Sequence, residues 1–184
     1  MTVIHPCDDI STEELTFQLI NNEGPSYMRT VRNKTARIYD EDSIGNVRIG
    51  FGSVLKEGTD VAIICCGVMV EQALKASEML SAEGIDCTVV DMHTIKPIDS
   101  GLLKDLAVKC GCFVTAEDHS VIGGLGSAVA EWASKNNPCP IEMIGVPDKF
   151  GQSGSPMDMM SEMGLTSEDI HSAAITAINR KNDS

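Results

Sequence analysis

The sequence predicts an α/β protein in which a mainly parallel sheet is covered on both faces by helices. From about residue 60 onward, short unbroken apolar runs alternate with longer segments whose apolar residues recur at helical spacing. Unbroken apolar runs are typical of strands that are buried on both faces. Regular alternation of strand and helix indicates parallel strands joined by helical crossovers, and therefore a three-layer α/β/α architecture.

Turn and capping signals place the individual elements. The four strands are expected at residues 60–67, 86–91, 112–117 and 141–145. The helices that follow the first three strands are expected at residues 70–84, at 98–107 and around 129–133. The box Thr166-Ser-Glu-Asp169 caps a last helix, on which Ile170, Ala174 and Ile178 form one apolar stripe.

The first 36 residues do not fit this alternation. The box Ser11-Thr-Glu-Glu14 opens a short helix that ends near Asn21, and Gly24-Pro25 introduces a strand over residues 26–31. Such a helix–strand unit has no parallel neighbour within so short a segment and cannot bury its apolar faces alone. We interpret residues 1–36 as the end of another αβ domain, residues 37–58 as a connector and residues 59–184 as the sheet domain.

Composition excludes several classes of function. The 184 residues contain 27 acidic and 14 basic side chains, a formal net charge of −13 that disfavours nucleic acid and anionic membranes as partners. No apolar run approaches the roughly 20 residues of a spanning helix, and the first residues lack a basic start and an apolar stretch, so we expect no secretion. The seven cysteines lack disulfide-framework and metal-site spacing, so we expect free thiols, no metal site and a cytoplasmic location.

A basic cluster is the first candidate site. Arg29, Arg32, Lys34 and Arg37 lie in a stretch, residues 24–39, that contains no acidic residue. Arginines at the end of a strand can bind a phosphate through paired hydrogen bonds. The alternative is a solvated strand end whose arginines pair with the acidic residues at 40–42.

A glycine-rich segment, residues 117–126, is the second candidate site. It leads from the end of a strand into a helix, the edge at which ligands gather in open parallel sheets. Its candidate residues are Glu117, His119, Gly123 and Gly124. We favour a tight turn that lets the helix pack on the sheet, because the pattern is not GxGxxG and no lysine follows it. His93 and Lys96 also follow a strand end, where a capping or interface role is expected.

Taken together, five segments resemble the C-terminal part of a transketolase, a member of the thiamine-diphosphate enzyme superfamily. The five segments occur in the same order as in the family. They are Gly24-Pro-Ser-Tyr-Met-Arg-Thr-Val-Arg32, residues 56–67, residues 89–97, Glu117-Asp-His-Ser-Val-Ile-Gly-Gly-Leu-Gly-Ser-Ala-Val129, and Gly145-Val-Pro-Asp-Lys-Phe-Gly-Gln-Ser-Gly154. The likeness covers nearly the whole chain and is strongest to the second polypeptide of transketolases encoded as two chains.

The resemblance implies both a domain assignment and a function. Residues 1–36 would be the tail of the pyrimidine-binding domain, and residues 59–184 would be the C-terminal domain that supports the dimer. Arg32 falls on the family's substrate-phosphate arginine, with Arg29 as its neighbour. The family's activating glutamate and its magnesium motif have no counterpart here, so no catalytic residue is assigned. Thiamine diphosphate and magnesium are expected in the complete enzyme, bound with the help of the N-terminal partner, and not on this chain alone.

The resemblance leaves alternatives open. Deoxyxylulose-phosphate synthase and the beta chain of 2-oxo acid dehydrogenases share this order of domains. Glu117-Asp-His119 ahead of the paired glycines favours transketolase. A non-catalytic dimerisation module is a further alternative, which the helix–strand unit at residues 1–36 disfavours.

Overall fold

The structure, a computed structural model, describes residues 1–183. Its main sheet has five strands in the order β3-β5-β4-β7-β8. These strands are β3 (Ser53–Lys56), β4 (Val61–Cys65), β5 (Cys87–Asp91), β7 (Phe113–Ser120) and β8 (Ile141–Val146). Pairing is parallel between β5, β4, β7 and β8, whereas β3 joins the edge at β5 in the antiparallel direction. The predicted mainly parallel sheet is therefore confirmed.

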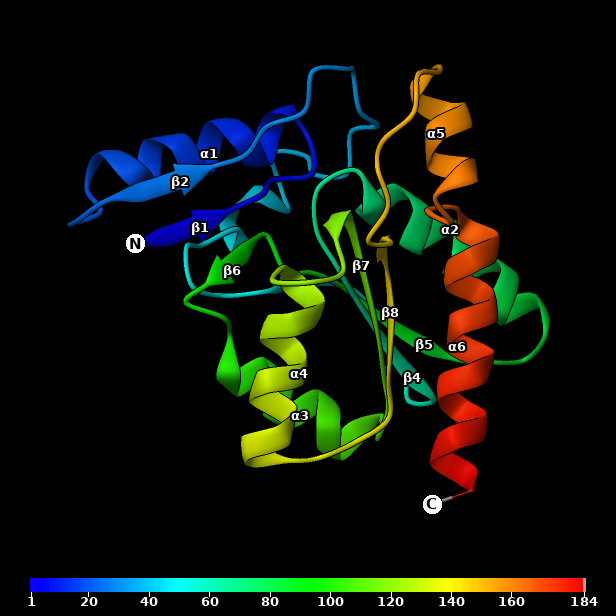
Figure 1. The fold of residues 1–184 in the computed structure, drawn as a ribbon. Coiled ribbons are helices and arrows are strands. Elements are labelled where there is room, and N and C mark those ends of the chain that lie inside the picture. Colours follow the sequence, from blue (N-terminus) through cyan, green and yellow to red (C-terminus); the bar gives the residue numbers. More distant parts are fainter. Residues whose placement is uncertain (184) are drawn as a thin grey trace.

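Strand β4 shows why the sheet has two apolar faces. Because successive side chains of a strand point to opposite faces, Val61, Ile63 and Cys65 enter one core. Ala62, Ile64 and Cys66 enter the other core, and all six side chains are completely buried. The first core is covered by α2 (Met69–Ala82) and α6 (Ser167–Asn182), and the second by α3 (Ser100–Lys109) and α4 (Leu125–Asn136) (Figure 1). The helices on the two faces complete the expected three layers.

Helix ends agree with the sequence where a strong cap is present. Thr166 caps α6 through the expected capping box with Asp169. Helix α3 begins two residues later than expected, because Asp99 is its N-cap and accepts a hydrogen bond from the amide of Leu102. One further short helix, α5 (Pro156–Glu162), precedes α6.

The N-terminal segment differs from its prediction in one important respect. Besides α1 (Asp9–Ile20) and β2 (Ser26–Met28), it contains a strand at its very start, β1 (Thr2–Ile4). Strand β1 pairs with β2 in parallel and with β6 (Thr94–Lys96) in the antiparallel direction, which makes a second sheet of three strands. The expectation that the strand after Gly24-Pro25 has no parallel neighbour is therefore wrong. A three-residue strand is too short to produce a recognisable apolar alternation.

Two other expectations for this half of the chain need correction. The N-cap of α1 is Asp8, and Ser11 takes the N3 position of the capping box, so the helix starts before the predicted Ser11. The stretch at 37–58, for which no helix or strand was predicted, contains the 3-10 turn Ile44–Asn46 and the edge strand β3.

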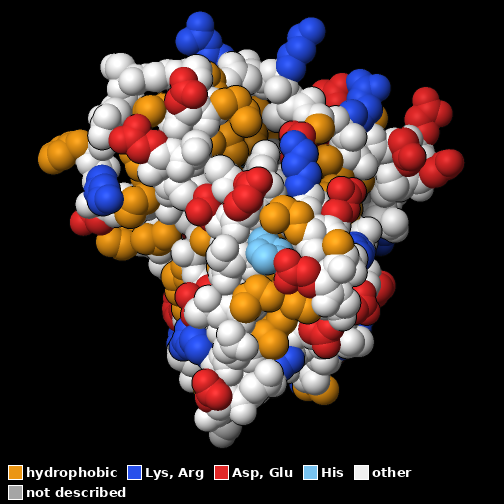
Figure 2. All heavy atoms as spheres, turned by 90° about the vertical axis from the view of Figure 1, so that its right-hand side faces the viewer, with side chains coloured by type: hydrophobic (Ala, Val, Ile, Leu, Met, Phe, Trp, Pro, Cys, Tyr) orange, Lys and Arg blue, Asp and Glu red, His pale blue; other side chains and the backbone are white. Residues whose placement is uncertain are grey.

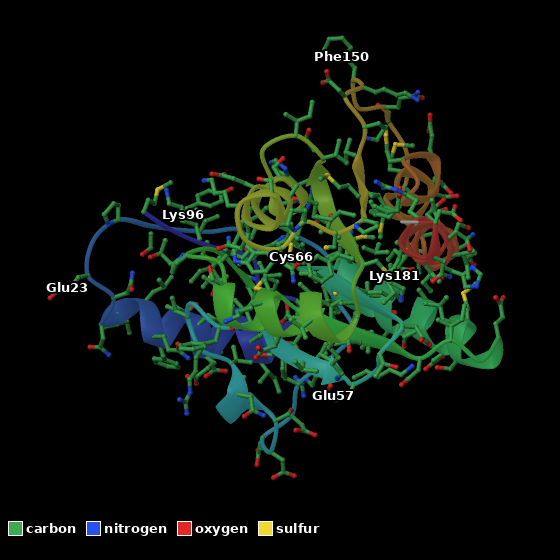
Figure 3. The ribbon with its side chains drawn as sticks, turned by 90° about the horizontal axis from the view of Figure 1, so that it is seen from below. Glu23, Glu57, Cys66, Lys96, Phe150 and Lys181 are labelled. Atoms are coloured by element: carbon green, nitrogen blue, oxygen red, sulfur yellow. The ribbon has the colours of Figure 1, made fainter. Side chains whose placement is uncertain are left out.

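Charges are interspersed on the surface above α2, α5 and α6. Figure 2 shows acidic and basic side chains side by side on this face, with apolar areas between them. Figure 3 shows Cys66 in the middle of the molecule and Phe150 projecting from the loop that precedes α5. The Phe150 side chain is 98% exposed. Within residues 1–183, no helix is both long enough and apolar enough to cross a membrane.

Candidate functional site

The N-terminal segment lies over the carboxyl edge of the main sheet. Strand β1 pairs with β6, and the amide of His5 donates a 2.8 Å hydrogen bond to the carbonyl oxygen of His93, which follows β5. The His5 ring lies against Gly67, whose φ of +59° is a conformation that favours glycine. Any side chain at Gly67 would overlap the His5 ring. The edge at which open parallel sheets usually bind ligands is thus filled by the protein's own residues.

Two histidines at this edge are buried and neutral. Burial lowers the pKa of His5 to about 3 and the pKa of His93 to about 4. His93 Nδ1 lies 3.0 Å from the hydroxyl of Thr94. Within residues 1–183, neither Nε2 atom has a hydrogen-bond partner. Both rings therefore pack as uncharged groups at neutral pH.

An ion pair links the N-terminal unit to β7. The Arg29 guanidinium, just beyond β2, donates from Nη2 to Asp118 Oδ2 at 2.8 Å and from Nη1 to Asp118 Oδ1 at 3.2 Å. The same Nη2 also donates to the carbonyl oxygen of Asp118 at 2.9 Å. Burial raises the pKa of Asp118, and the adjacent Arg29 charge acts in the opposite direction. Arg29 is therefore already engaged by a carboxylate.

Arg32 differs from its neighbours in the basic cluster. It is exposed, and it makes no hydrogen bond or ion pair with any other residue in the range 1–183. Arg37, by contrast, binds the carboxylate of Asp9, so the arginines of this segment do not pair with the acidic residues at 40–42. A cleft of about 640 Å³ lies between α1 and the residues on either side of Arg32, among them Thr30, Asn33 and Lys34. Arg32 itself does not line this cleft, although its sequence neighbours Val31 and Asn33 do.

The glycine-rich segment has a clear packing role. Glu117, which is 2% exposed, accepts 2.8 Å hydrogen bonds from the amides of Leu125 and Gly126 at the start of α4. Its carboxylate thus caps a helix whose N-cap, Gly124, has no side chain to do so. A Cβ at Gly124 would overlap this carboxylate. The two helix amides that would face an external anion are already occupied by Glu117.

The structure brings the two candidate sites together. A small pocket of about 120 Å³ is lined by Arg29 and by all four candidate residues of the segment at 117–126. Glu117 belongs to β7, as predicted, and His119 belongs to it as well, because the strand extends to Ser120 and not only to residue 117. The His119 side chain is exposed, and its Nδ1 lies 2.9 Å from the carbonyl oxygen of Ser120. Arg32 does not line this pocket.

The donor groups on this chain do not suit a diphosphate–magnesium site. Within residues 1–183, no cluster of three or more His, Cys, Asp and Glu side chains is arranged to bind a metal ion. Magnesium prefers several oxygen ligands, and the carboxylates of Glu117 and Asp118 are already bound by amides and by Arg29. All seven cysteines are free thiols.

Comparison with known proteins identifies the family. Residues 50–170 match the model described as the transketolase C-terminal domain. The chain belongs to this family. Over 182 residues, it is 41% identical to the 6-deoxy-6-sulfo-D-fructose transketolase subunit SqwH of Clostridium sp. (strain MSTE9), covering 99% of this chain and 56% of that protein.

Two further relatives of this transketolase C-terminal domain support the assignment. A putative transketolase C-terminal section of Methanocaldococcus jannaschii is 40% identical over 92% of this chain and 53% of that protein. A solved structure described as a split gene transketolase, inactive beta4 tetramer, superposes with a TM-score of 0.94 at 44% identity, covering 98% of this chain and 59% of that one. The chain thus spans just over half the length of each of these three proteins.

Sequence reasoning missed the residues that fill the carboxyl edge of the transketolase C-terminal domain. His5, Tyr39, Asp91 and Asp118 received no role, although they make the contacts between the N-terminal half and the sheet. The one available signal was their position, since Asp91 and Asp118 each lie at or near the end of a predicted buried strand. Their partners lie 52 and 89 residues away, and no local pattern identifies such pairs.

Proposed function

We propose that this chain supplies the C-terminal section of a transketolase, which transfers a two-carbon ketol unit between sugar phosphates. The observation that carries the proposal is the match of residues 50–170 to the transketolase C-terminal domain. Relatives named as a transketolase subunit and a transketolase C-terminal section support it. The partner would be an N-terminal transketolase section, with which this chain forms the active enzyme.

Thiamine diphosphate and magnesium would bind mainly through that partner. When bound, the cofactor supplies the electron sink on which ketol transfer depends. For this chain we propose a role in assembly and substrate binding rather than in cofactor chemistry. We assign residues 1–36 to the tail of the pyrimidine-binding domain, residues 37–58 to the connector and residues 59–184 to the C-terminal domain.

Within this function, Arg32 would bind the phosphate of the sugar-phosphate substrate. Arg29 and Arg37 are each engaged by a carboxylate, whereas Arg32 is exposed and lies in the chain between Val31 and Asn33, which line an open cleft. A guanidinium without an internal partner can make two parallel hydrogen bonds to phosphate oxygens. Thr30 and Asn33 line this cleft, and we expect them to contact the sugar.

Reconstitution tests the assignment to transketolase. The chain alone should show no ketol transfer, and addition of the N-terminal section with thiamine diphosphate and magnesium should produce it. Calorimetry on the chain alone should show no binding of the cofactor. Turnover of sugar phosphates by the isolated chain would refute the proposal, and so would a reconstituted pair that is inactive with every sugar phosphate tested.

A matched pair of variants tests the phosphate anchor in the reconstituted enzyme. Arg32→Ala should raise the KM for sugar phosphates by about tenfold or more, because it removes a charge-assisted contact to the substrate. Arg48→Ala, which removes an exposed arginine that does not line this cleft, should leave KM within about twofold. Equal KM values for Arg32→Ala and the unsubstituted enzyme would show that Arg32 does not bind the substrate phosphate.

The assembly and location of the chain are also proposals. We expect two copies of this chain to associate in the complete enzyme, and sedimentation of the reconstituted enzyme tests this. A single copy per particle at high concentration would contradict it. The free cysteines support a reducing, cytoplasmic compartment, which cell fractionation would check.

A further inference from the structure

Arg32 lies in a segment without secondary structure that is fixed at both ends. Residues 29–38 form no helix and no strand. At the far end, the amides of Ile38 and Tyr39 each donate a 2.8 Å hydrogen bond to Asp8 Oδ2. At the near end, the amide of Arg29 donates to the carbonyl oxygen of Ile4 at 2.9 Å. The course of the segment between these points therefore depends on how firmly its two ends are held.

The side chain of Arg29 provides the firmest of these attachments. Its guanidinium makes three hydrogen bonds to Asp118, two to the carboxylate and one to the main-chain carbonyl. Two parallel bonds between a guanidinium and a carboxylate fix orientation as well as distance. The Asp118 side chain is only 17% exposed, and His5 Nε2 lies 3.6 Å from its Oδ1. The pair is therefore partly shielded from solvent, more on the Asp118 side than at Arg29, whose side chain is 32% exposed.

We infer that Asp118 is a positioning residue for substrate binding, which acts through Arg29 to hold the neighbouring Arg32 where the substrate phosphate binds. The inference rests on the proposed function of Arg32. It assigns to the sheet domain a direct part in substrate affinity, because Asp118 belongs to β7 whereas Arg29 and Arg32 follow β2. Asp118 does not itself contact the substrate, since both of its oxygens face Arg29.

The alternative is that Arg29 binds the phosphate itself. In that case Asp118 competes with the substrate for Arg29, and removing its charge should lower KM. If Asp118 acts as a positioning residue, removing its charge should raise KM. The two interpretations thus predict opposite signs for the same variant.

Asp118→Asn in the reconstituted enzyme is the test. The amide keeps the size of the side chain but loses the charge that binds Arg29. We expect the KM for sugar phosphates to rise about tenfold while kcat stays within about threefold, because the phosphate anchor is displaced and the reacting groups are untouched. The double variant Asp118→Asn/Arg29→Gln should have a KM no higher than that of the more impaired single variant, because both substitutions break the same Arg29–Asp118 ion pair.

Glu142→Gln is the matched control. Glu142 in β8 binds Arg180 at 2.6 Å, and Arg180 also donates to a main-chain carbonyl, that of Ile141, as Arg29 does to Asp118. This control removes a more exposed ion pair, away from the segment at 29–38, and should leave KM unchanged. Amide hydrogen exchange of residues 30–37 in the full chain should accelerate in Asp118→Asn and not in Glu142→Gln.

Several outcomes would overturn the inference. An unchanged or lowered KM in Asp118→Asn contradicts it, as does a fall in kcat with KM unchanged, or additive effects in the double variant. These results differ from failure of the proposed function, because Arg32→Ala reports on that separately. If Arg32→Ala raises KM and Asp118→Asn does not, Arg32 binds the substrate phosphate and only the positioning role of Asp118 is refuted.

Discussion

The hydroxyl of Tyr39 donates a 2.9 Å hydrogen bond to Asp91 Oδ2, which joins the segment before β3 to the end of β5. Both side chains are almost fully buried. Within residues 1–183, the other carboxylate oxygen of Asp91 has no hydrogen-bond partner. Burial raises the pKa of Asp91 to about 7, and the hydrogen bond from Tyr39 limits that rise. This contact helps to explain how the N-terminal half is held on the sheet.

Tyr39→Phe should lower the free energy of unfolding by about 1–3 kcal/mol, because it leaves a buried carboxyl group without its donor. Urea denaturation of the full chain measures the change. Tyr27→Phe is the matched control, since Tyr27 is 52% exposed, and it should alter stability by less than about 0.5 kcal/mol. Equal effects of the two substitutions would show that the Tyr39 hydroxyl contributes nothing specific.

Asp91 should make the protein more stable as the pH falls from about 8 to about 5.5. In this range, folded Asp91 with a pKa of about 7 binds a proton that the unfolded chain, with an ordinary pKa of 3.8, does not hold. The unsubstituted chain should therefore gain about 2 kcal/mol relative to Asp91→Asn, which cannot titrate, over this interval. Denaturation of both proteins at the two pH values tests this. A constant difference between them would be inconsistent with a raised pKa.

His93, in contrast to Asp91, should make the protein less stable as the pH falls. The folded state keeps this histidine neutral down to a pKa of about 4, whereas the unfolded chain takes up a proton near pH 6.5, so His93 costs stability as the pH falls. His93→Gln should remove this loss, which amounts to about 1–1.5 kcal/mol between about pH 8 and about pH 5.5. The same denaturation series measures it. A variant whose pH dependence equals that of the unsubstituted chain would argue against a buried neutral ring.

Gly124→Ala should destabilise the chain by about 1–3 kcal/mol, because its Cβ would displace the Glu117 carboxylate from the start of α4. Thermal or urea unfolding measures the loss. Gly45→Ala is the control, since a Cβ at Gly45 meets no atom within 4 Å, and it should be close to neutral. Retention of full stability in Gly124→Ala would mean that the Glu117 carboxylate can move away from the start of α4 without a loss of stability.

Prediction from sequence succeeded where a signal is local and repeated. The strands β4 and β5 are unbroken apolar runs, and α6 begins at a recognisable capping box, so each element was predicted close to its observed position. Prediction failed for β1, β3 and β6, which contain only three or four residues. Strands so short are formed by pairing with neighbours rather than by their own pattern.

The residues of the candidate site could likewise be predicted only where their signal is local in the sequence. The cluster of basic residues at 29–37 is visible in the sequence, and so is the glycine-rich segment before α4. The partner of each arginine is not visible, since Asp118 lies 89 residues from Arg29 and Asp9 lies 28 residues from Arg37. Which arginine stays available for a ligand is therefore decided by contacts between distant segments.

The sequence by itself determined the layered α/β architecture and the family, because apolar periodicity and ordered motifs are properties of the chain read residue by residue. Only the tertiary structure decided that His5, Arg29 and Tyr39 fill the carboxyl edge of the sheet and that Arg32 is left exposed. The physical reason is that burial and ion pairing depend on distances in space. Those distances are set when β1 pairs with β6 and places the N-terminal half over the sheet.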